Sequence, residues 1–210
     1  MSGTRTHSRR AGGLAVVAAS ALLLSGCGNA EPAAAPPAQP EPLLLSGPTT
    51  HVMVAIPTGW HQVINSANPV IPQMVAPTTC MGDNEVSCAL GLVRTATTTA
   101  PTIEEAAKAV EDAVTGEPGI TKGATLNQGP AKIGKRDGYR HRFTFTNPTA
   151  NLTAEVAAVP SGPTTPNPDG TLEYSIVLAW VSDKPDAPKP DVIDQIVDST
   201  LVYGGQPPHE

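Results

Sequence analysis

Three cysteines are the side chains in this sequence best suited to covalent chemistry, and the first of them, Cys27, directly follows a short apolar run. The segment Leu24-Ser25-Gly26-Cys27 has the residue types of the processing site of bacterial lipoproteins. At such a site the Cys thiolate is the nucleophile that accepts a diacylglycerol group, and the small residues before it let the peptidase close on the backbone. The pattern predicts that Cys27 is acylated and becomes the first residue of the mature protein.

The residues ahead of Cys27 have the composition of an export signal. Arg5, Arg9 and Arg10 come first, no acidic residue is present, and an apolar run follows from Ala11 to Leu24. This order is typical of a secretory signal peptide, and the run is shorter than the roughly 20 residues of a permanent membrane helix. We therefore expect residues 1–26 to be a removed signal peptide. Ser8-Arg9-Arg10 suggests twin-arginine export as the alternative, but Ala11-Gly12-Gly13 lack the residues expected after such a pair, so the general secretory route is favoured.

Processing would leave an acidic mature chain. Removing the signal peptide takes away three of the 13 Lys and Arg and none of the 19 Asp and Glu, so the mature net charge is ten minus nineteen, or −9. This charge argues against a nucleic-acid partner and against adhesion to anionic lipid by charge alone. The expected location is the extracytoplasmic face of the cell membrane, where acyl chains on Cys27 hold the protein.

The two remaining cysteines, Cys80 and Cys88, lie on either side of a polar, turn-like segment. Outside the cytoplasm, such a pair is typical of a disulfide. The alternatives are two free thiols or half of a metal site. The spacing differs from CxxC and no Cys or His cluster completes four ligands, so a disulfide is the favoured interpretation and no metal is predicted.

Composition and periodicity divide the rest of the chain. A Pro- and Ala-rich tether is predicted over residues 27–48, a single domain over 49–204 and a disordered tail over 205–210. The apolar patch Leu43-Leu44-Leu45 within the tether either docks on the domain or begins it.

The domain has the pattern of an α+β fold. A capping box of Thr102 and Glu105 and an apolar stripe at helical spacing predict a helix over 102–115, and a second helix is expected over 191–201. Short β-type runs bounded by turn residues predict strands that form an antiparallel meander. These strands are expected over residues 51–56, 70–75, 89–95, 125–133, 138–146, 152–159 and 172–181.

Several of these pieces, in this order, resemble a known family. Val54-Ala55-Ile56-Pro57-Thr58-Gly59-Trp60, Gly138-Tyr139 at the start of a strand, and the helix over 192–202 are similar to the LpqN/LpqT-type lipoproteins of mycobacteria, over roughly residues 51–203. The resemblance implies a Mog1/PsbP-like α/β/α sandwich with a twisted antiparallel sheet, in a superfamily of mostly binding or assembly factors. The segment from Cys80 to Cys88 departs from the family pattern, and the family has no shared catalytic residues to carry over.

No further motif for catalysis or cofactor binding occurs in the sequence. GxSxG, GxGxxG, P-loop and HExxH patterns are absent, and the histidines are scattered. Glu104-Glu105 and Glu111-Asp112 are expected on the exposed side of a helix. We therefore predict a protein without catalytic activity, cofactor or metal.

One basic cluster and one aromatic residue are candidates for binding. Five of the ten Lys and Arg residues of the mature chain lie between residues 132 and 142. The favoured interpretation of this cluster is a solvated strand face beside a basic turn, and the alternative is contact with an anion or a partner. Trp60 is expected to cover one end of the core, with ligand binding as the alternative. The five cations are Lys132, Lys135, Arg136, Arg140 and Arg142.

The leading hypothesis for function is a lipid-anchored envelope protein, without catalytic activity, that binds a protein partner or scaffolds a complex. The first alternative is a carrier or sensor of a small apolar or lipid ligand held between sheet and helix, and the second is a hydrolase with an unrecognised site. A large apolar cavity would favour the carrier, and a convergent Ser, His and carboxylate cleft would favour the hydrolase.

The acylation of Cys27 can be tested directly. Cys27→Ala removes the only thiol at the processing site, so we expect both acylation and cleavage of the signal peptide to be lost. Mass spectrometry of the protein extracted from membranes measures both. A Cys27→Ala protein that is still processed and lipid-labelled would overturn the assignment.

Overall fold

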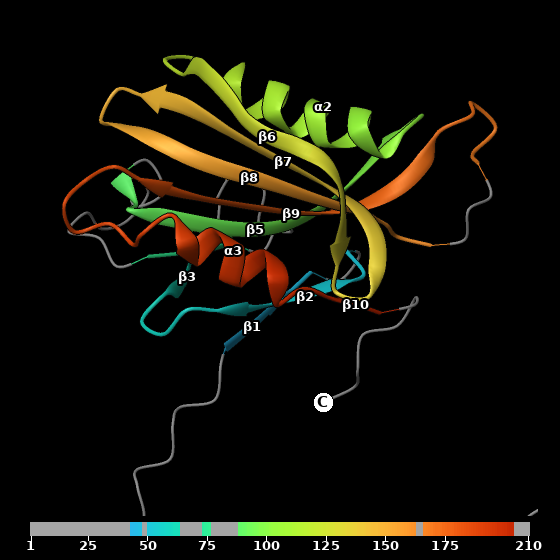
Figure 1. Cartoon of the computed structure of the whole chain (residues 1–210), viewed down its shortest axis with the longest axis horizontal. Coiled ribbons are helices and arrows are strands. Elements are labelled where there is room, and N and C mark those ends of the chain that lie inside the picture. Colours follow the sequence, from blue (N-terminus) through green and yellow to red (C-terminus); the bar gives the residue numbers. More distant parts are fainter. Residues whose placement is uncertain (1–42, 48–49, 64–72, 77–87, 163–165, 204–210) are drawn as a thin grey trace, which may run out of the picture. The chain divides into compact units, whose positions relative to one another are not determined.

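The computed structural model describes residues 43–47, 50–63, 73–76, 88–162 and 166–203, all of them within the unit formed by residues 40–210. The described residues form a seven-stranded antiparallel sheet, a three-stranded antiparallel sheet and the helices α2 and α3 (Figure 1). The predicted α+β class is confirmed.

The seven-stranded sheet has the order β3-β4-β5-β9-β8-β7-β6 and the smaller one the order β1-β2-β10. Most neighbours in the larger sheet are also neighbours in sequence, as the predicted meander requires. The strands are β1 (Leu43–Ser46), β2 (Val52–Ile56), β3 (His61–Val63), β4 (Gln73–Val75), β5 (Gly91–Ala100), β6 (Thr121–Ile133), β7 (Arg136–Asn147), β8 (Ala150–Pro160), β9 (Leu172–Ser182) and β10 (Leu201–Val202).

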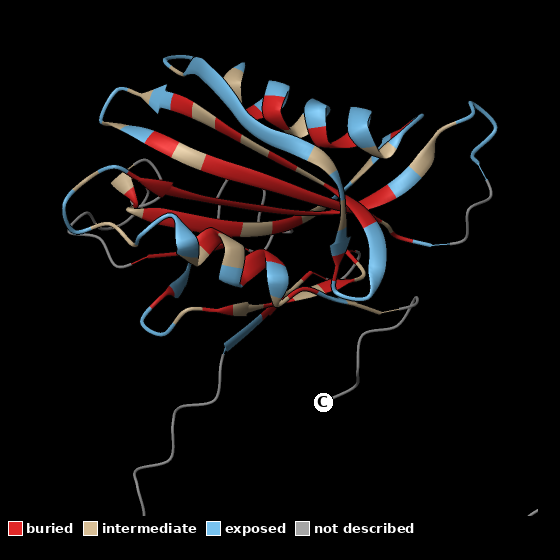
Figure 2. Ribbon diagram, viewed as in Figure 1, coloured by how far each residue is buried: buried red, intermediate tan, exposed pale blue. Residues whose placement is uncertain are grey.

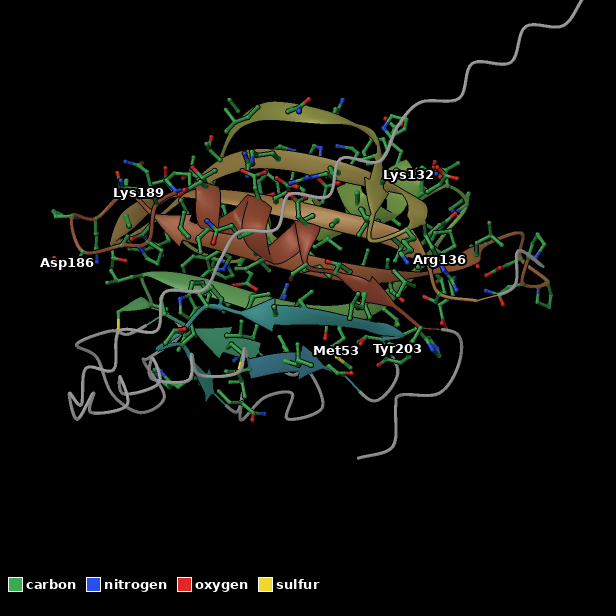
Figure 3. The ribbon with its side chains drawn as sticks, turned by 60° about the horizontal axis from the view of Figure 1, so that its bottom comes forward. Met53, Lys132, Arg136, Asp186, Lys189 and Tyr203 are labelled. Atoms are coloured by element: carbon green, nitrogen blue, oxygen red, sulfur yellow. The ribbon has the colours of Figure 1, made fainter. Side chains whose placement is uncertain are left out.

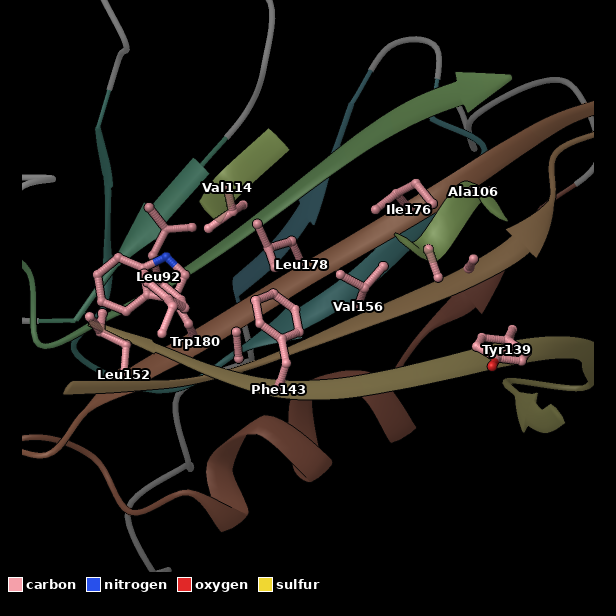
Figure 4. Close-up of a cluster of buried hydrophobic side chains, with 14 of the residues drawn as sticks. Leu92, Ala106, Val114, Tyr139, Phe143, Leu152, Val156, Ile176, Leu178 and Trp180 are labelled. Atoms are coloured by element: carbon pink, nitrogen blue, oxygen red, sulfur yellow. The ribbon is translucent and has the colours of Figure 1, made fainter. Parts of the chain in front are cut away.

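Three layers result, because the central strands have apolar side chains on both faces. On β8 and β9, Val156 and Leu178 belong to one buried cluster while their neighbours Ala157 and Val177 belong to another. The first cluster packs beneath α2 (Ile103–Thr115), as Figure 4 shows, and the second beneath α3 (Asp191–Asp198) and the smaller sheet. Nearly the whole length of β8 and β9 is therefore buried (Figure 2). The predicted sandwich has formed, with the three-stranded sheet sharing its third layer.

Helix α2 begins where its capping box predicts. The Glu105 backbone amide donates a hydrogen bond to Thr102 Oγ1, and the Thr102 amide donates in return to Glu105 Oε2, at 3.2 and 3.1 Å. This reciprocal pair satisfies backbone donors that the first turn of a helix leaves without partners. Buried residues Ala106, Ala107 and Val114 then face the sheet, so the helical stripe is core.

Helix α3 ends earlier than predicted, at Asp198 instead of residue 201. Ser199 Oγ donates to the carbonyl of Ile196 at 2.7 Å and accepts a hydrogen bond from the backbone amide of Ala55 at 2.9 Å. The end of the helix is thereby tied to β2, and Leu201 enters the smaller sheet opposite Met53. The helix is shorter because the residues after it pair with β2, and helical periodicity in the sequence cannot predict such a pairing.

The domain also begins earlier than the predicted boundary at residue 49. Leu43–Ser46 form β1, which pairs with β2 so that Leu45 lies opposite Val54 and is buried. The predicted tether over 27–48 therefore ends before Leu43. Residues 205–210, predicted to be a disordered tail, lie outside the described residues.

A glycine at the start of β5 makes room for Trp60. A Cβ atom on Gly91 would lie 2.9 Å from Cη2 of Trp60 and 3.2 Å from the carbonyl oxygen of Trp180. Gly91→Ala must displace a buried indole, and overpacking of this kind costs about 1–3 kcal/mol of unfolding free energy. Urea denaturation followed by tryptophan fluorescence measures this loss.

Gly162→Ala is the matched control, because no atom lies within 4 Å of the Cβ that it would add. We expect its midpoint to stay close to that of the unmodified protein. Equal midpoints for Gly91→Ala and the control would contradict the packing described for Trp60.

Candidate functional site

Two arginines of the basic cluster belong to an ionic network beneath α3. Arg140 and Arg142 are on the same face of β7, and Glu155 of β8 is directly opposite Arg142. Arg140 Nε donates a hydrogen bond to Glu155 Oε1, and Arg142 Nε lies 2.8 Å from Glu155 Oε2. From α3, Asp194 lies 2.8 Å from Arg140 Nη2 and 3.0 Å from Arg142 Nη2. Asp198 adds a contact of 3.0 Å to Arg140 Nη1, so two cations meet three carboxylates.

This network corrects the favoured interpretation of Arg140 and Arg142 as part of a solvated face. Their side chains are about one-quarter exposed, and Glu155 between them is only 2% exposed. Burial by itself would lower the pKa of Arg140, but the hydrogen bond to Glu155 and the three carboxylate charges raise it overall. Both side chains therefore attach α3 to the sheet and are not free to bind an anion.

The other three cations of the cluster are separate from this network. Lys132 Nζ lies 2.6 Å from Asp137 Oδ1. Lys135, in the turn between β6 and β7, and Arg136, the first residue of β7, are exposed and have no ion pair among the residues that the structure describes. The five cations do not form one patch, and only Lys135 and Arg136 remain available for contact with an anion.

A second ionic cluster lies on the opposite face of the sheet, beneath α2. His141 Nε2 is 3.0 Å from Glu111 Oε2, and both side chains are buried. Lys122 Nζ lies 3.1 Å from Glu111 Oε1, and the hydrogen bond to Glu111 raises the pKa of Lys122. The His141 ring stacks on Phe143 with centroids 5.4 Å apart. Glu111 was expected to be exposed, and its burial against His141 corrects that expectation.

A pocket of about 240 Å³ lies at the first turn of α2, where β7 and β9 begin and β8 ends. Its floor is apolar, and its two charged lining residues, Asp137 and Glu173, are both exposed acids. The remaining lining residues are Ile103, Gly138, Pro160, Gly162, Leu172 and Tyr174. No sequence motif marked this pocket, because its residues come from four separate segments.

Further acids of α2 influence the tyrosines around the pocket. Burial, together with the charge of Glu104 and a hydrogen bond to it, raises the pKa of Tyr139. Burial and the charge of Glu105 raise the pKa of Tyr174. Both phenols therefore stay neutral at physiological pH. The side chains of Glu104, Glu105, Asp137 and Glu173 gather at this end of the sheet.

The remaining candidates from the sequence have these positions. Trp60 is buried in the cluster beneath α3, as expected of a residue that covers the core. Cys88 begins the described segment 88–162, while its expected partner Cys80 lies outside the described residues, so the disulfide stays a prediction. Cys27 also lies outside them.

Neither a metal centre nor a membrane span is found in the part of the chain that the structure describes. No group of three His, Cys, Asp or Glu side chains in these ranges is arranged to hold an ion. No helix within them is both long and apolar enough to cross a bilayer.

Comparisons with known proteins give similarity at the level of solved structures. No family model matches the sequence, and no curated protein matches it. LpqN of Mycobacterium tuberculosis, described as involved in cell envelope biogenesis, is 12% identical, with a TM-score of 0.49 over 72% of this chain and 83% of its own. PsbP (CyanoP) of Synechocystis sp. PCC 6803 is 15% identical, with a TM-score of 0.44 over 86% and 99%.

A protein of Bacteroides thetaiotaomicron is 9% identical, with a TM-score of 0.44 over 76% of this chain and 48% of its own. This chain therefore spans about half the length of that protein.

The role of Glu155 can be tested by stability. Glu155→Gln leaves two partly buried guanidinium groups without their central carboxylate, and breaking a buried ion pair in this way costs about 3–5 kcal/mol. Asp198→Asn removes a carboxylate that is 67% exposed, which should cost less than about 1 kcal/mol. Urea denaturation measures the free energy of unfolding of both variants. Equal losses of this free energy would contradict a central role of Glu155 in the network.

Proposed function

We propose that this protein is held by acyl chains on Cys27 at the extracytoplasmic face of the cell envelope, where it binds a protein partner and performs no catalysis. The Leu24-Ser25-Gly26-Cys27 pattern and the basic and apolar residues before it support the anchor. Partner binding is supported by the acidic pocket at the first turn of α2, which is suited to a lysine or arginine side chain of another protein.

The size and lining of the pocket favour a single side chain as its occupant. Pockets for drug-sized ligands usually measure about 300–1,000 Å³, and this one measures about 240 Å³. An arginine or lysine has an apolar stem and a cationic end. The stem would pack on Leu172 and Tyr174, and the cation would lie beside Glu173, since Asp137 is already paired with Lys132.

The same geometry is less favourable to the two alternatives. A carrier would hold its apolar ligand between the sheet and the helices, where the described residues form two packed clusters of buried side chains. A hydrolase would need a nucleophile and a base in the pocket, but the lining residues that the structure describes include no Ser, Thr, Cys or His. His141 is engaged with Glu111 beneath α2.

The charge preference of the pocket can be tested with a small probe. N-acetyl-arginine amide should bind the detergent-solubilised full chain with a Kd of about 1 mM, from roughly 0.3 kcal/mol for each heavy atom of the ligand. N-acetyl-citrulline amide has nearly the same shape without the charge, and it should bind about two- to fivefold more weakly, since an ion pair with an exposed carboxylate contributes up to about 1 kcal/mol. NMR shifts at Leu172 and Tyr174 report the binding.

A matched pair of variants localises the effect. Glu173→Gln removes a pocket carboxylate and should weaken binding of the arginine probe, whereas Glu117→Gln, just beyond the other end of α2, should leave it unchanged. Equal binding of the two probes, or shifts centred away from the pocket, would contradict the assignment of this pocket to a basic side chain.

A further inference from the structure

The outer face of the smaller sheet is apolar although it is not covered by any described element. The side chains of Leu45, Val52, Val54 and Ile56 point inward and are buried, so their neighbours in each strand point outward. Leu44 is 51% exposed and Leu201 is 60% exposed. Leu201 pairs with Met53, and Leu44 pairs with Ala55. We call Leu44, Met53, Ala55, Leu201 and Tyr203 the outer face.

A single polar contact orders this face. Tyr203 Oη and Ser46 Oγ are 2.7 Å apart, across the full width of the three-stranded sheet. The Tyr203 ring also makes an edge contact with His51, with centroids 6.3 Å apart. These two contacts hold the Tyr203 side chain in place on the outer face.

The basic turn between β6 and β7 lies against the same sheet. A Cβ atom on Gly134 would be 2.5 Å from the carbonyl oxygen of Thr200 and 4.0 Å from Cγ2 of Val202. Gly134 has φ +57, so both its conformation and this close approach require glycine. In Figure 1 the turn descends beside β10, and in Figure 3 Arg136 is on the same side of the molecule as Tyr203. Lys135 and Arg136, which lack ion-pair partners among the described residues, therefore lie at the β10 edge of the smaller sheet, on the side of the molecule that holds Tyr203.

We propose that the outer face and the basic turn together form the surface by which this domain rests on the membrane. This inference uses the acyl anchor of the proposed function but not its acidic pocket. The chain enters the domain at Leu43, next to Leu44 on the outer face. Residues 28–42 connect this point to Cys27, and fifteen residues of Pro-rich chain reach roughly 45 Å at most. An anchored domain is thus close enough to touch the bilayer with the face from which its tether emerges.

Charge complementarity selects a bilayer as the occupant. The mature chain has a net charge of −9, which anionic headgroups repel, yet the cations of the turn that lack partners are beside its apolar face. Apolar side chains bordered by Lys and Arg are the composition of surfaces that bind at the boundary of headgroups and acyl chains. A second copy of the chain is a poorer occupant, because stable protein interfaces use about 20–30 residues on each side.

Photocrosslinking of the acylated full chain tests this orientation. The protein is reconstituted into vesicles of phosphatidylethanolamine and phosphatidylglycerol, with p-benzoylphenylalanine in place of Leu201 or, as control, in place of Leu126. Leu126 is similarly exposed, at 54%, but belongs to β6 away from the outer face. We expect lipid adducts from position 201 at least about tenfold above those from position 126, measured by mass spectrometry.

Two variants that each remove one positive charge test whether the basic turn contacts the membrane. Arg136→Gln should reduce lipid adducts from position 201 roughly fivefold, which is the effect of about one unit of charge near an anionic surface. Lys189→Gln removes the same charge from the loop before α3, on the opposite side of Figure 3, and should leave the adducts unchanged.

Vesicle flotation, crosslinking and probe binding test the acyl anchor, the membrane-facing surface and the pocket separately. Vesicle flotation first reports the anchor, so a protein that does not float overturns the acylation and this orientation together. A protein that floats but gives equal adducts at both positions, or crosslinks to a second copy of itself from position 201, overturns the membrane-facing surface alone. Binding of the arginine probe to the pocket is independent of all these results.

Discussion

The pairing of Glu155 with Arg140 and Arg142 is the interaction on which the arrangement of the third layer depends. Glu155 is in β8, a strand buried on both faces, and a buried carboxylate without partners would cost several kcal/mol. The two arginines of β7 satisfy it from the same sheet, and their remaining donors reach Asp194 and Asp198 of α3. Because α3 is fixed in this way, Ser199 at its end meets the backbone of β2, and the smaller sheet is fixed in turn.

The same constraint acts on the opposite face of the sheet. Glu111 of α2 is buried, and it is compensated by His141 of β7 and by Lys122 of β6. One strand, β7, thus presents alternate residues to ionic partners in both covering layers. Charged groups whose residue types suggest the surface thus attach both helices to the sheet.

Local signals in the sequence predicted much of the fold, and pairing between distant residues explains what they did not predict. The helix over 102–115 was predicted correctly because Thr102 and Glu105 are three residues apart, and alternation correctly placed Arg140 and Arg142 on one face. Their partners in α3 lie 52 to 58 residues further along the chain, beyond the reach of periodicity. The pocket was not predicted for the same reason. Leu43–Ser46 was placed in the predicted tether because its partner among the described strands, β2, is identified only in the folded protein.

The turn between β6 and β7 connects the two proposed surfaces. Gly134, on one side of it, touches Thr200 beside the outer face, while Asp137 and Gly138, on its other side, line the acidic pocket. Lys132 and Asp137 form an ion pair beside this turn, so the positive charge of one and the negative charge of the other compensate each other. A domain that rests on the bilayer through this turn would hold its pocket at a fixed height near the membrane surface. The effective concentration of a basic segment of a neighbouring membrane protein at the pocket would then be raised, because both proteins are confined to the same membrane surface.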